Sequence, residues 1–262
     1  RIAGLGRSIN LFGDLRAILS IRSEILTNKP DVINTHTAKA GVIGRIAAIR
    51  TGTRVVHTFH GHLLYGYFSP LKTRIVILIE KLMERYTDKF ISVGNRVKTD
   101  LILAKIGNDS KYVVIPPAIF APKFLSKNEA RKILGIEIKG TVVGWLGRLT
   151  TIKHPERVIV LAQAFPDVTF IIGGLGDLYE EIHKIAPSNV KMLGWVLPEI
   201  FWPSCDIALL TSDNEGLPTA LIEAGLAGIA TIAENVGSVP EIIEDGKTGI
   251  LVRGAKERAS AL

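Results

Sequence analysis

Short β-branched runs alternate with helical patterns along most of the chain, and this alternation is the strongest constraint on the fold. Such runs are typical of buried parallel strands. Strands alternating with helices predict parallel sheets covered by helices. The predicted strands are at residues 31–35, 54–59, 89–93, 112–115, 141–146, 168–172, 190–193, 207–210, 229–232 and 250–252. The predicted helices in the first half are at residues 14–26, 38–50, 71–86 and 95–106.

The segment PPAIFAPK at residues 116–123 interrupts the alternation. Its three prolines cannot continue a helix or a central strand. We therefore expect a linker here, within an α/β chain of two Rossmann-like domains at residues 1–120 and 121–262. Ser126 and Glu129 then form a capping-box pattern that predicts the next helix. Because ligands of open α/β sheets bind at the carboxyl ends of the strands, residues that follow strands are the functional candidates.

Charge is distributed unevenly between the two halves. Residues 1–140 contain 23 Lys and Arg against 10 Asp and Glu, whereas residues 141–262 contain 9 against 15. This asymmetry suggests different partners for the two domains. The basic half has no aromatic stacking surface or nucleic-acid-binding motif, so we expect no nucleic acid partner.

Cysteine usage and hydropathy predict the compartment. The single cysteine, Cys205, excludes an internal disulfide, and it is expected to be a small buried hydrophobe. The longest aliphatic run, residues 75–79, is much shorter than the ~20 residues of a membrane span. The sequence also opens without a signal-peptide pattern. We expect a cytoplasmic protein, either free or attached to the inner face of the plasma membrane.

The segment EGLPTALIE at residues 215–223 is the most informative motif. Pro218 suits the first turn of a helix, which places Glu215 and Gly216 where free backbone N–H groups favour an anion such as a diphosphate. Glu223 lies one helical turn beyond Thr219, where a carboxylate can accept hydrogen bonds from sugar hydroxyls. The alternative interpretation is an ordinary helix cap followed by a solvated glutamate.

A second candidate site follows the predicted strand at residues 141–146. Arg148 and Lys153 place two cations on one loop, which suits a diphosphate leaving group. The alternative is a pair of solvated surface charges. The sequence GGLGD at residues 173–177 is a weaker signal, because it is not a complete dinucleotide-binding fingerprint.

Three histidines, His57, His60 and His62, follow one another in HTFHGH. Their spacing matches no zinc pattern, so we expect no metal site. We expect His60 to face the ligand cleft. His57 either points the same way along a regular strand or is structural. His36, at the end of the preceding predicted strand, either lines the cleft or caps a helix.

The predicted helix at residues 71–86 combines cations with apolar residues. They are Lys72, Arg74, Lys81 and Arg85, with Ile75, Ile77, Leu78, Leu82 and Met83. One interpretation is a helix that lies in the interface of an anionic membrane. The other is an apolar stripe buried in the core, with the cations forming a solvated face.

Taken together, these segments resemble the family 4 glycosyltransferases of GT-B fold. The resemblance is carried by PDVINTHTAKAGVIGR, VVHTFHGHLLYGYFSPLKTR, TDKFISVGNRVKTDL, GWLGRLTTIKHPERVI, FIIGGLGD, KMLGWV, SDNEGLPTALIEAGLAG and NVGSVPEIIEDGKTGILV. Glu215 and Glu223 form the family's E-x7-E element. HTHTAKAG and HTFHGH are most similar to bacterial enzymes that extend lipid-linked surface polysaccharides.

The resemblance implies a retaining, metal-independent transfer from a nucleotide sugar, with UDP as the expected nucleotide and no cofactor. It is usually drawn as a front-face reaction without a protein nucleophile. It implies that Arg148 and Lys153 hold the diphosphate and stabilise its charge as it leaves. Glu215 would contact the donor sugar, and Glu223 the ribose hydroxyls. The further residues implied are Gly174, Gly216 and Leu217 at the donor, Val196 at the base, and His60 facing the transferred sugar.

The sequence departs from the family at both ends. It opens at a point that resembles the interior of the family's N-terminal domain, and the family's closing helices are absent after residue 252. Gly237 and Ser238 stand where a Gly-Gly pair is common. We therefore expect an incomplete N-terminal domain, an intact donor site, a lipid-linked glycan as the acceptor, and a homodimer formed through the exposed surface of the N-terminal domain.

Two other functions fit parts of the pattern. One is an inactive relic that binds a nucleotide sugar or self-associates without catalysis. The other is a UDP-sugar epimerase of the same fold, although its acid/base set is not found here.

Overall fold

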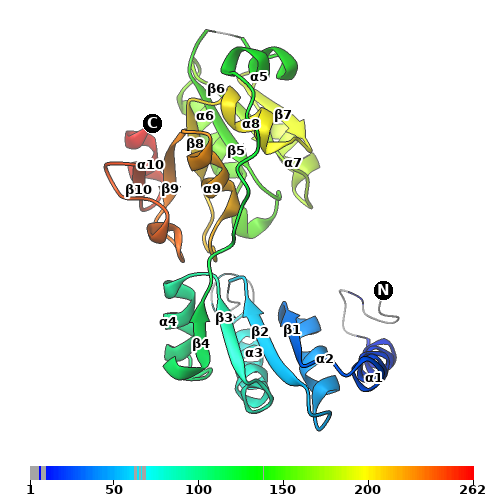
Figure 1. The fold of residues 1–262 in the computed structure, drawn as a ribbon. Helices are drawn as coiled ribbons and strands as arrows, with labels where there is room; N and C mark the ends of the chain where they lie inside the picture. Colours follow the sequence, from blue (N-terminus) through cyan, green and yellow to red (C-terminus); the bar gives the residue numbers. More distant parts are fainter. Residues whose placement is uncertain (1–5, 7–9, 62–63, 65, 67–68, 138) are drawn as a thin grey trace. The chain divides into compact units, whose positions relative to one another are not determined.

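The computed structural model describes the chain except for residues 1–5, 7–9, 62–63, 65, 67–68 and 138. The chain forms two compact units, Arg1–Pro116 and Pro117–Leu262, and each is described by itself (Figure 1). The division falls between the first two prolines of the predicted linker, four residues before the expected boundary.

The first unit contains a parallel sheet of four strands in the order β1-β2-β3-β4. The strands are β1 (Val32–His36), β2 (Arg54–Phe59), β3 (Lys89–Ser92) and β4 (Tyr112–Val114). The helices are α1 (Leu11–Asn28), α2 (Ala38–Ala48), α3 (Pro70–Met83) and α4 (Asn95–Leu103), with short 3₁₀ turns η1 (Glu84–Tyr86) and η2 (Asp109–Lys111). Each of the three strand–helix–strand connections leads to the next strand in the same direction across the sheet. Because such connections are right-handed, they place α2, α3 and α4 on one face of the sheet.

Side chains of alternate strand residues show which face is covered. Val55, His57 and Phe90 are buried, as expected for the face beneath the helices. Val32 and Val113, which point to the opposite face, are 49% and 46% exposed. The sheet is therefore packed on one side and partly open on the other.

An ion pair between Arg45 of α2 and Glu80 of α3 lies inside the first unit. The Arg45 guanidinium donates to Glu80 Oε1 at 2.9 Å, and a second nitrogen lies 2.8 Å from Oε2. Arg45 is fully buried and Glu80 is 4% exposed. Because loss of one partner would leave a buried charge, such a replacement typically costs about 3–5 kcal/mol. The pair fixes which face of α3 points inward.

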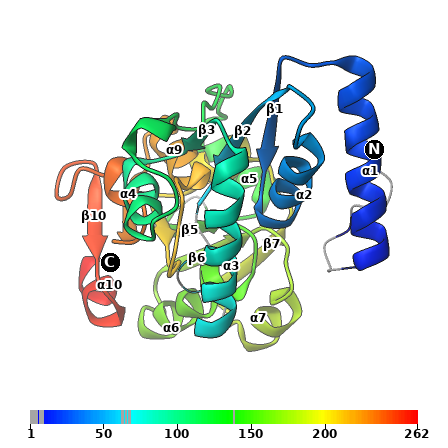
Figure 2. The ribbon, with the colours of Figure 1, turned by 90° about the horizontal axis from the view of Figure 1, so that it is seen from below.

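Helix α1 packs on α2 at the β1 end of the sheet (Figure 2). Arg22 anchors it by donating to the carbonyl oxygens of Ala47 and Ile49 at 3.2 and 2.7 Å. Its outer face exposes Leu11, Phe12, Leu15, Leu19 and Leu26. Strand β1 is an edge strand, which can pair with another chain. A homodimer through this surface stays a prediction.

The second unit contains a parallel sheet of six strands in the order β10-β9-β8-β5-β6-β7. The strands are β5 (Val142–Leu146), β6 (Thr169–Gly173), β7 (Val190–Gly194), β8 (Ile207–Leu210), β9 (Ala230–Glu234) and β10 (Gly249–Val252). The helices are α5 (Lys127–Leu134), α6 (Glu156–Ala164), α7 (Tyr179–Ile185), α8 (Pro198–Ser204), α9 (Thr219–Leu226) and α10 (Ala255–Ala261). The short 3₁₀ turns are η3 (Thr151–Lys153) and η4 (Val239–Glu241).

The core of the second unit confirms the prediction for Cys205. The residue is 1% exposed and belongs to an apolar cluster with Phe201 and Trp202. Burial raises the pKa of its thiol to about 12, so the thiol behaves as a small apolar group. Gly144 of β5 is required beside it, because a Cβ there would lie 2.3 Å from the Cys205 sulfur.

The predicted elements are present, with shifted ends. Helix α1 runs from Leu11 to Asn28, beyond both ends of the predicted range 14–26. Helix α4 stops at Leu103 rather than 106, because Lys105 and Gly107 adopt φ values of 61° and 71° that no α-helix accepts. Among the described residues, no helix is both long and apolar enough to cross a bilayer.

Candidate functional site

Three loops at the carboxyl ends of β5, β6 and β7 are held together by backbone hydrogen bonds. Gly147 N donates to the Gly173 carbonyl at 3.0 Å, and Gly174 N donates to the Gly194 carbonyl at 2.6 Å. Gly174 has a φ of 122°, and a Cβ there would lie 1.9 Å from Gly147 O. The glycine after β6 is therefore required for this close approach, and it fixes the loop that carries Arg148.

Lys153 and Glu215 come together from different loops. Lys153 ends the turn η3 after β5, and Glu215 follows β8. The Lys153 ammonium lies 2.5 Å from Glu215 Oε1, and the Ser212 hydroxyl donates to the same oxygen at 2.6 Å. Glu215 is only 7% exposed, whereas a quarter of the Lys153 side chain is accessible. A part-exposed ammonium held beside a buried carboxylate is positioned to meet an incoming anion.

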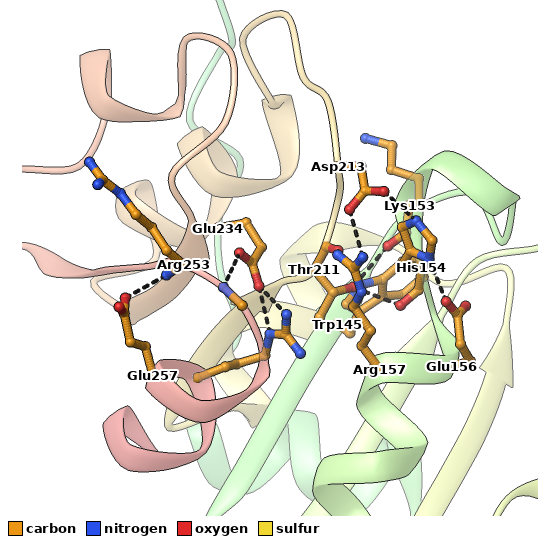
Figure 3. Close-up of polar contacts among 12 residues, drawn as sticks. Trp145, Lys153, His154, Glu156, Arg157, Thr211, Asp213, Glu234, Arg253 and Glu257 are labelled. Atoms are coloured by element: carbon orange, nitrogen blue, oxygen red, sulfur yellow. Dashed lines mark hydrogen bonds and ion pairs between the residues drawn. The ribbon is translucent and has the colours of Figure 1, made fainter. Parts of the chain in front are cut away.

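A network behind Lys153 fixes the turn that carries it. The Trp145 indole donates to Thr211 Oγ1 at 2.9 Å, and the Thr211 hydroxyl donates to the Lys153 carbonyl at 2.8 Å. Trp145 and Thr211 are both buried, so this link between β5 and β8 is shielded from water. Figure 3 shows these residues gathered behind Lys153.

Asp213 adds polar contacts from the loop after β8. His154 Nε2 lies 2.7 Å from one Asp213 oxygen, and an Arg157 nitrogen lies 2.6 Å from the other (Figure 3). Arg157 also donates to the Thr211 carbonyl at 2.8 Å. His154 has a φ of 49°, and the second side of its ring contacts Glu156. The loops after β5 and β8 are thereby joined at several points.

The loop after β9 supports Glu215 from behind. Gly237 has a φ of 50°, and a Cβ there would lie 1.9 Å from the Glu215 carbonyl oxygen. Ser238 N donates to the Gly216 carbonyl at 3.1 Å, and the Ser238 hydroxyl is buried without a hydrogen-bond partner. Sequence reasoning treated Gly237 and Ser238 as a minor departure from the family pattern and did not identify Ser212. Ser212 follows strand β8, and Gly237 and Ser238 follow strand β9; these positions after strands could have indicated that the three residues belong to the site.

The helix that follows Glu215 begins one residue later than expected. Pro218 was predicted in the first turn, but it is the N-cap of α9, with extended backbone at ψ 110°. The carbonyl of Pro218 accepts from Leu221 N at 3.1 Å, so the proline still begins the helix. Gly216 and Leu217 form the turn that leads into it.

Glu223 lies on α9 in a half-buried position. Burial is the main cause that raises the pKa of its carboxyl, and the charge of Glu199 adds to the rise. The indole of Trp202 lies 3.5 Å from Glu223 Oε2 and opposes the rise. The described contacts do not join Glu223 to the Lys153–Glu215 pair. A carboxylate kept half-buried with one long hydrogen bond has free acceptor capacity.

The remaining predicted residues of the second unit occupy loops at the same edge. Arg148 is exposed on the loop after β5. Val196, after β7, packs with the cluster of Phe201 and Cys205. Its Cγ1 lies 2.8 Å from the position of a Cβ on Gly173, so that glycine is required for the packing.

In the first unit, His36 and His60 contact each other at the ends of β1 and β2. His36 Nδ1 lies 2.9 Å from His60 Nε2, and the rings stack with centroids 5.1 Å apart. The side chain of His60 is exposed overall, but its ring is partly shielded from water. This partial burial, together with the neighbouring His36, lowers the pKa of the ring. The structure thus gives His36 a partner that sequence reasoning did not identify.

His57 is a structural residue in the covered face of the same sheet. It is 1% exposed, and its Nδ1 lies 2.8 Å from Thr35 Oγ1. Burial, followed by the charge of Arg45, lowers the pKa of His57 to about 3. Gly41 of α2 leaves room for its ring, because a Cβ there would lie 2.4 Å from the imidazole.

His62 lies outside the described residues. Within the described part of the chain, no three His, Cys, Asp or Glu side chains form a group that could hold a metal ion. The histidine-rich segment therefore separates into a core residue, His57, and an exposed residue, His60, that is paired with His36.

Comparison with known proteins defines the class. Residues 126–261 match the family described as "Glycosyl transferases group 1", and residues 5–120 match "Glycosyltransferase Family 4". The chain belongs to this family of glycosyltransferases. Its two parallel α/β sheets are those of the GT-B fold.

Particular relatives make the class more specific. The chain is 30% identical, over 95% of its length and 69% of the relative's, to the Escherichia coli UDP-Gal:alpha-D-GlcNAc-diphosphoundecaprenol alpha-1,3-galactosyltransferase. It is 24% identical to the Staphylococcus aureus capsular polysaccharide biosynthesis glycosyltransferase CapM, over 97% of this chain and 72% of that one. The crystal structure of Anabaena HepE in complex with UDP-glucose aligns with a TM-score of 0.84 and 25% identity, covering 96% of this chain and 72% of HepE.

Proposed function

We propose that this glycosyltransferase moves a sugar from a UDP-sugar to a lipid-linked glycan, with retention of anomeric configuration and without a metal ion. The observation that carries the proposal is the meeting of Lys153, Ser212 and Glu215 at the carboxyl edge of the second sheet. Ligands of open α/β sheets bind at this edge. The choice of UDP is supported by the UDP-glucose bound to HepE and by the UDP-Gal in the name of the E. coli relative.

In this proposal Lys153 and Arg148 hold the diphosphate. As the sugar leaves, negative charge grows on the diphosphate oxygens, and fixed cations lower the energy of that state. Lys153 exchanges part of its contact with Glu215 for the diphosphate, and the exposed Arg148 adds a bidentate contact. Two side-chain cations supply the charge that Mg²⁺ provides in other transferases, which supports metal independence.

Glu215 and Glu223 contact hydroxyl groups of the donor. The Glu215 carboxylate is held by Lys153 and Ser212 and faces the transferred sugar, beside the amides of Gly216 and Leu217. Glu223 accepts from the ribose hydroxyls, which use its unfilled hydrogen-bonding capacity. Gly174 shapes the loop beside the diphosphate, and Val196 lies at the base.

The proposed acceptor rests on the similarity of this chain to a relative whose acceptor is named. The E. coli relative is named for a diphosphoundecaprenol-linked acceptor, and we extend that class of acceptor to this chain. His60 of the first unit stays the residue that the family resemblance implies for the transferred sugar, and within that unit its ring contacts His36. The unpaired, buried Cys205 is consistent with the reducing cytoplasm, where we place the protein.

Nucleotide titration tests the donor site. UDP, GDP and ADP are titrated by calorimetry in EDTA against the wild type, Glu223→Ala and Glu180→Ala, an exposed glutamate on α7 that serves as the matched control. UDP should bind the wild type and Glu180→Ala alike and bind Glu223→Ala about tenfold or more weakly, since a hydrogen bond to a charged group contributes about 1.5–3 kcal/mol. Absence of nucleotide binding, or binding that requires a metal, would contradict the proposal.

A further inference from the structure

Helix α3 has one face that is fixed inward. Glu80 and Met83 are 4% and 5% exposed, and Glu80 is held by the buried ion pair with Arg45 of α2. The helix cannot rotate about its axis without breaking this pair. The face of α3 opposite Glu80 therefore points away from the core of the first unit.

The outward face of α3 is apolar. Leu71, Ile75, Leu78 and Leu82 are 69%, 50%, 68% and 50% exposed. At about 100° per residue, these four positions fall within an arc of about 60° and form one continuous stripe along the helix. The prediction left open whether the apolar residues of this helix were core. The structure places Ile75, Leu78 and Leu82 on the surface of the unit, whereas Met83 is buried and Ile77 is half-buried.

Cations border the stripe on both sides. The same helical spacing places Arg74 and Lys81 along one margin and Lys72 along the other. Arg85 follows the helix in the turn η1 and is exposed. The two acidic residues of this segment point elsewhere: Glu80 is buried against Arg45, and Glu84 pairs with Lys111 at 3.5 Å. Within Pro70–Tyr86, all of which the structure describes, the strongly exposed charges are positive.

We propose that this face of α3 is the docking surface for an anionic lipid bilayer. Apolar side chains at this spacing enter the boundary between headgroups and acyl chains, while flanking Lys and Arg contact lipid phosphates. Each cation near an anionic leaflet strengthens binding about fivefold. The surface goes beyond the proposed transferase site and does not depend on it, because vesicle binding is measured apart from UDP binding.

Helix α1 has a second exposed apolar stripe but lacks the charge pattern. Its side chains Leu15 and Leu19 are 56% and 59% exposed. The exposed charges of this helix are Arg16 and Glu24, which cancel. Charge complementarity to an anionic surface therefore favours α3, and α1 provides a control of equal hydrophobicity.

The test is co-sedimentation of the whole chain with vesicles of phosphatidylcholine, with and without phosphatidylglycerol. The wild type should bind the phosphatidylglycerol vesicles, and high salt should weaken the binding. Arg74→Gln with Arg85→Gln should weaken it about 30-fold. Leu78→Gln with Leu82→Gln should weaken it at every salt concentration, whereas Leu15→Gln with Leu19→Gln should leave it unchanged.

Three outcomes would overturn the proposal. Equal binding to neutral vesicles would show that the cations have no part. Loss of binding in the α1 variant but not in the α3 variants would locate the surface on α1. If no vesicle binding occurs and Leu78→Gln with Leu82→Gln converts a dimer to a monomer in light scattering, the occupant is a second copy of the chain. Unchanged circular dichroism and UDP affinity confirm that the variants are folded and that the donor site is separate.

Discussion

Glu223 illustrates at the residue scale how a carboxylate proposed to bind the donor can reduce stability. Its carboxyl is half-buried, and burial raises its pKa above the ordinary value of 4.5. As pH rises from 4.5 to the raised pKa, the unfolded chain has lost its proton while the folded chain retains it. Stability therefore falls across this window and stays lower above it.

Glu223→Gln should remove that fall. We predict that the variant gains thermal stability relative to the wild type as pH rises from 4.5 to 7, while its UDP affinity decreases. Differential scanning calorimetry across this range checks the stability, with Glu180→Gln on α7 as the control that should not diverge. A constant difference in melting temperature across the range would contradict the prediction.

His57 should have the opposite pH dependence in the first unit. Its pKa is about 3 in the folded state against an ordinary value of 6.5. Between pH 6.5 and 3 the unfolded chain binds more protons, so stability falls as the solution is acidified through this window.

His57→Gln should flatten this acid response, because glutamine does not titrate. The control is His183→Gln, since His183 is exposed on α7. Urea unfolding at pH 7 and pH 5 gives the comparison: the wild type and His183→Gln should lose more stability on acidification than His57→Gln. Equal losses in all three proteins would count against a buried neutral His57.

At the scale of elements, strand ends and loops determine where the site forms. The order of strands and helices could be predicted, because alternation and β-branched runs are local features of the sequence. The capping box was also local, and it is present: Ser126 N donates to Glu129 Oε2 at 3.1 Å at the start of α5.

Contacts between loops could not be predicted in the same way. The Lys153–Glu215 pair joins residues 62 positions apart, and the His36–His60 contact joins ends of two strands. Such contacts depend on the register of neighbouring strands. The helix boundaries that differed, at Leu103 and Pro218, depend on local φ and ψ values that the periodicity of side chains does not report.

The loop after β9 provides a prediction at this scale. In Gly237→Ala the new methyl would lie 1.9 Å from the Glu215 carbonyl, and alanine would be held at a φ of 50°. The variant should lose about 1–3 kcal/mol of stability and bind UDP more weakly, because Glu215 moves. Chemical denaturation and calorimetric titration measure the two effects.

Gly225→Ala is the matched control on α9. A Cβ at Gly225 meets nothing within 4 Å, and the residue is helical. Alanine should stabilise this helix by about 0.5–1 kcal/mol and leave UDP affinity unchanged. The account of Gly237 would be wrong if both alanine variants behaved alike.

At the scale of the whole molecule, the charge asymmetry corresponds to two surfaces with different partners. The basic first unit carries the α3 docking face, and the acidic second unit carries the proposed donor site. In the proposed function the net charge of the second unit does not describe its site, because the proposal assigns the diphosphate to Lys153, Arg148 and backbone amides, which act locally. The net charge of a domain therefore indicates which partners its surface attracts better than it indicates the charge of a ligand that the domain binds.

Self-association is the further prediction at this scale. Among the described residues β1 is an edge strand of the four-stranded sheet, and the same edge of a second copy can pair with it. Light scattering at micromolar concentration should give the mass of a dimer. A monomeric wild type would contradict this prediction.

Sugar transfer in the absence of metal tests the central claim most directly. Labelled UDP-glucose or UDP-galactose is incubated in EDTA with lipid-linked glycan acceptors and the wild type, Lys153→Ala or the exposed control Lys184→Ala. The account predicts that label enters the lipid fraction with the wild type and Lys184→Ala, and that Lys153→Ala slows transfer by about 100-fold or more. Transfer that persists unchanged in Lys153→Ala, or UDP binding without any transfer, would contradict it.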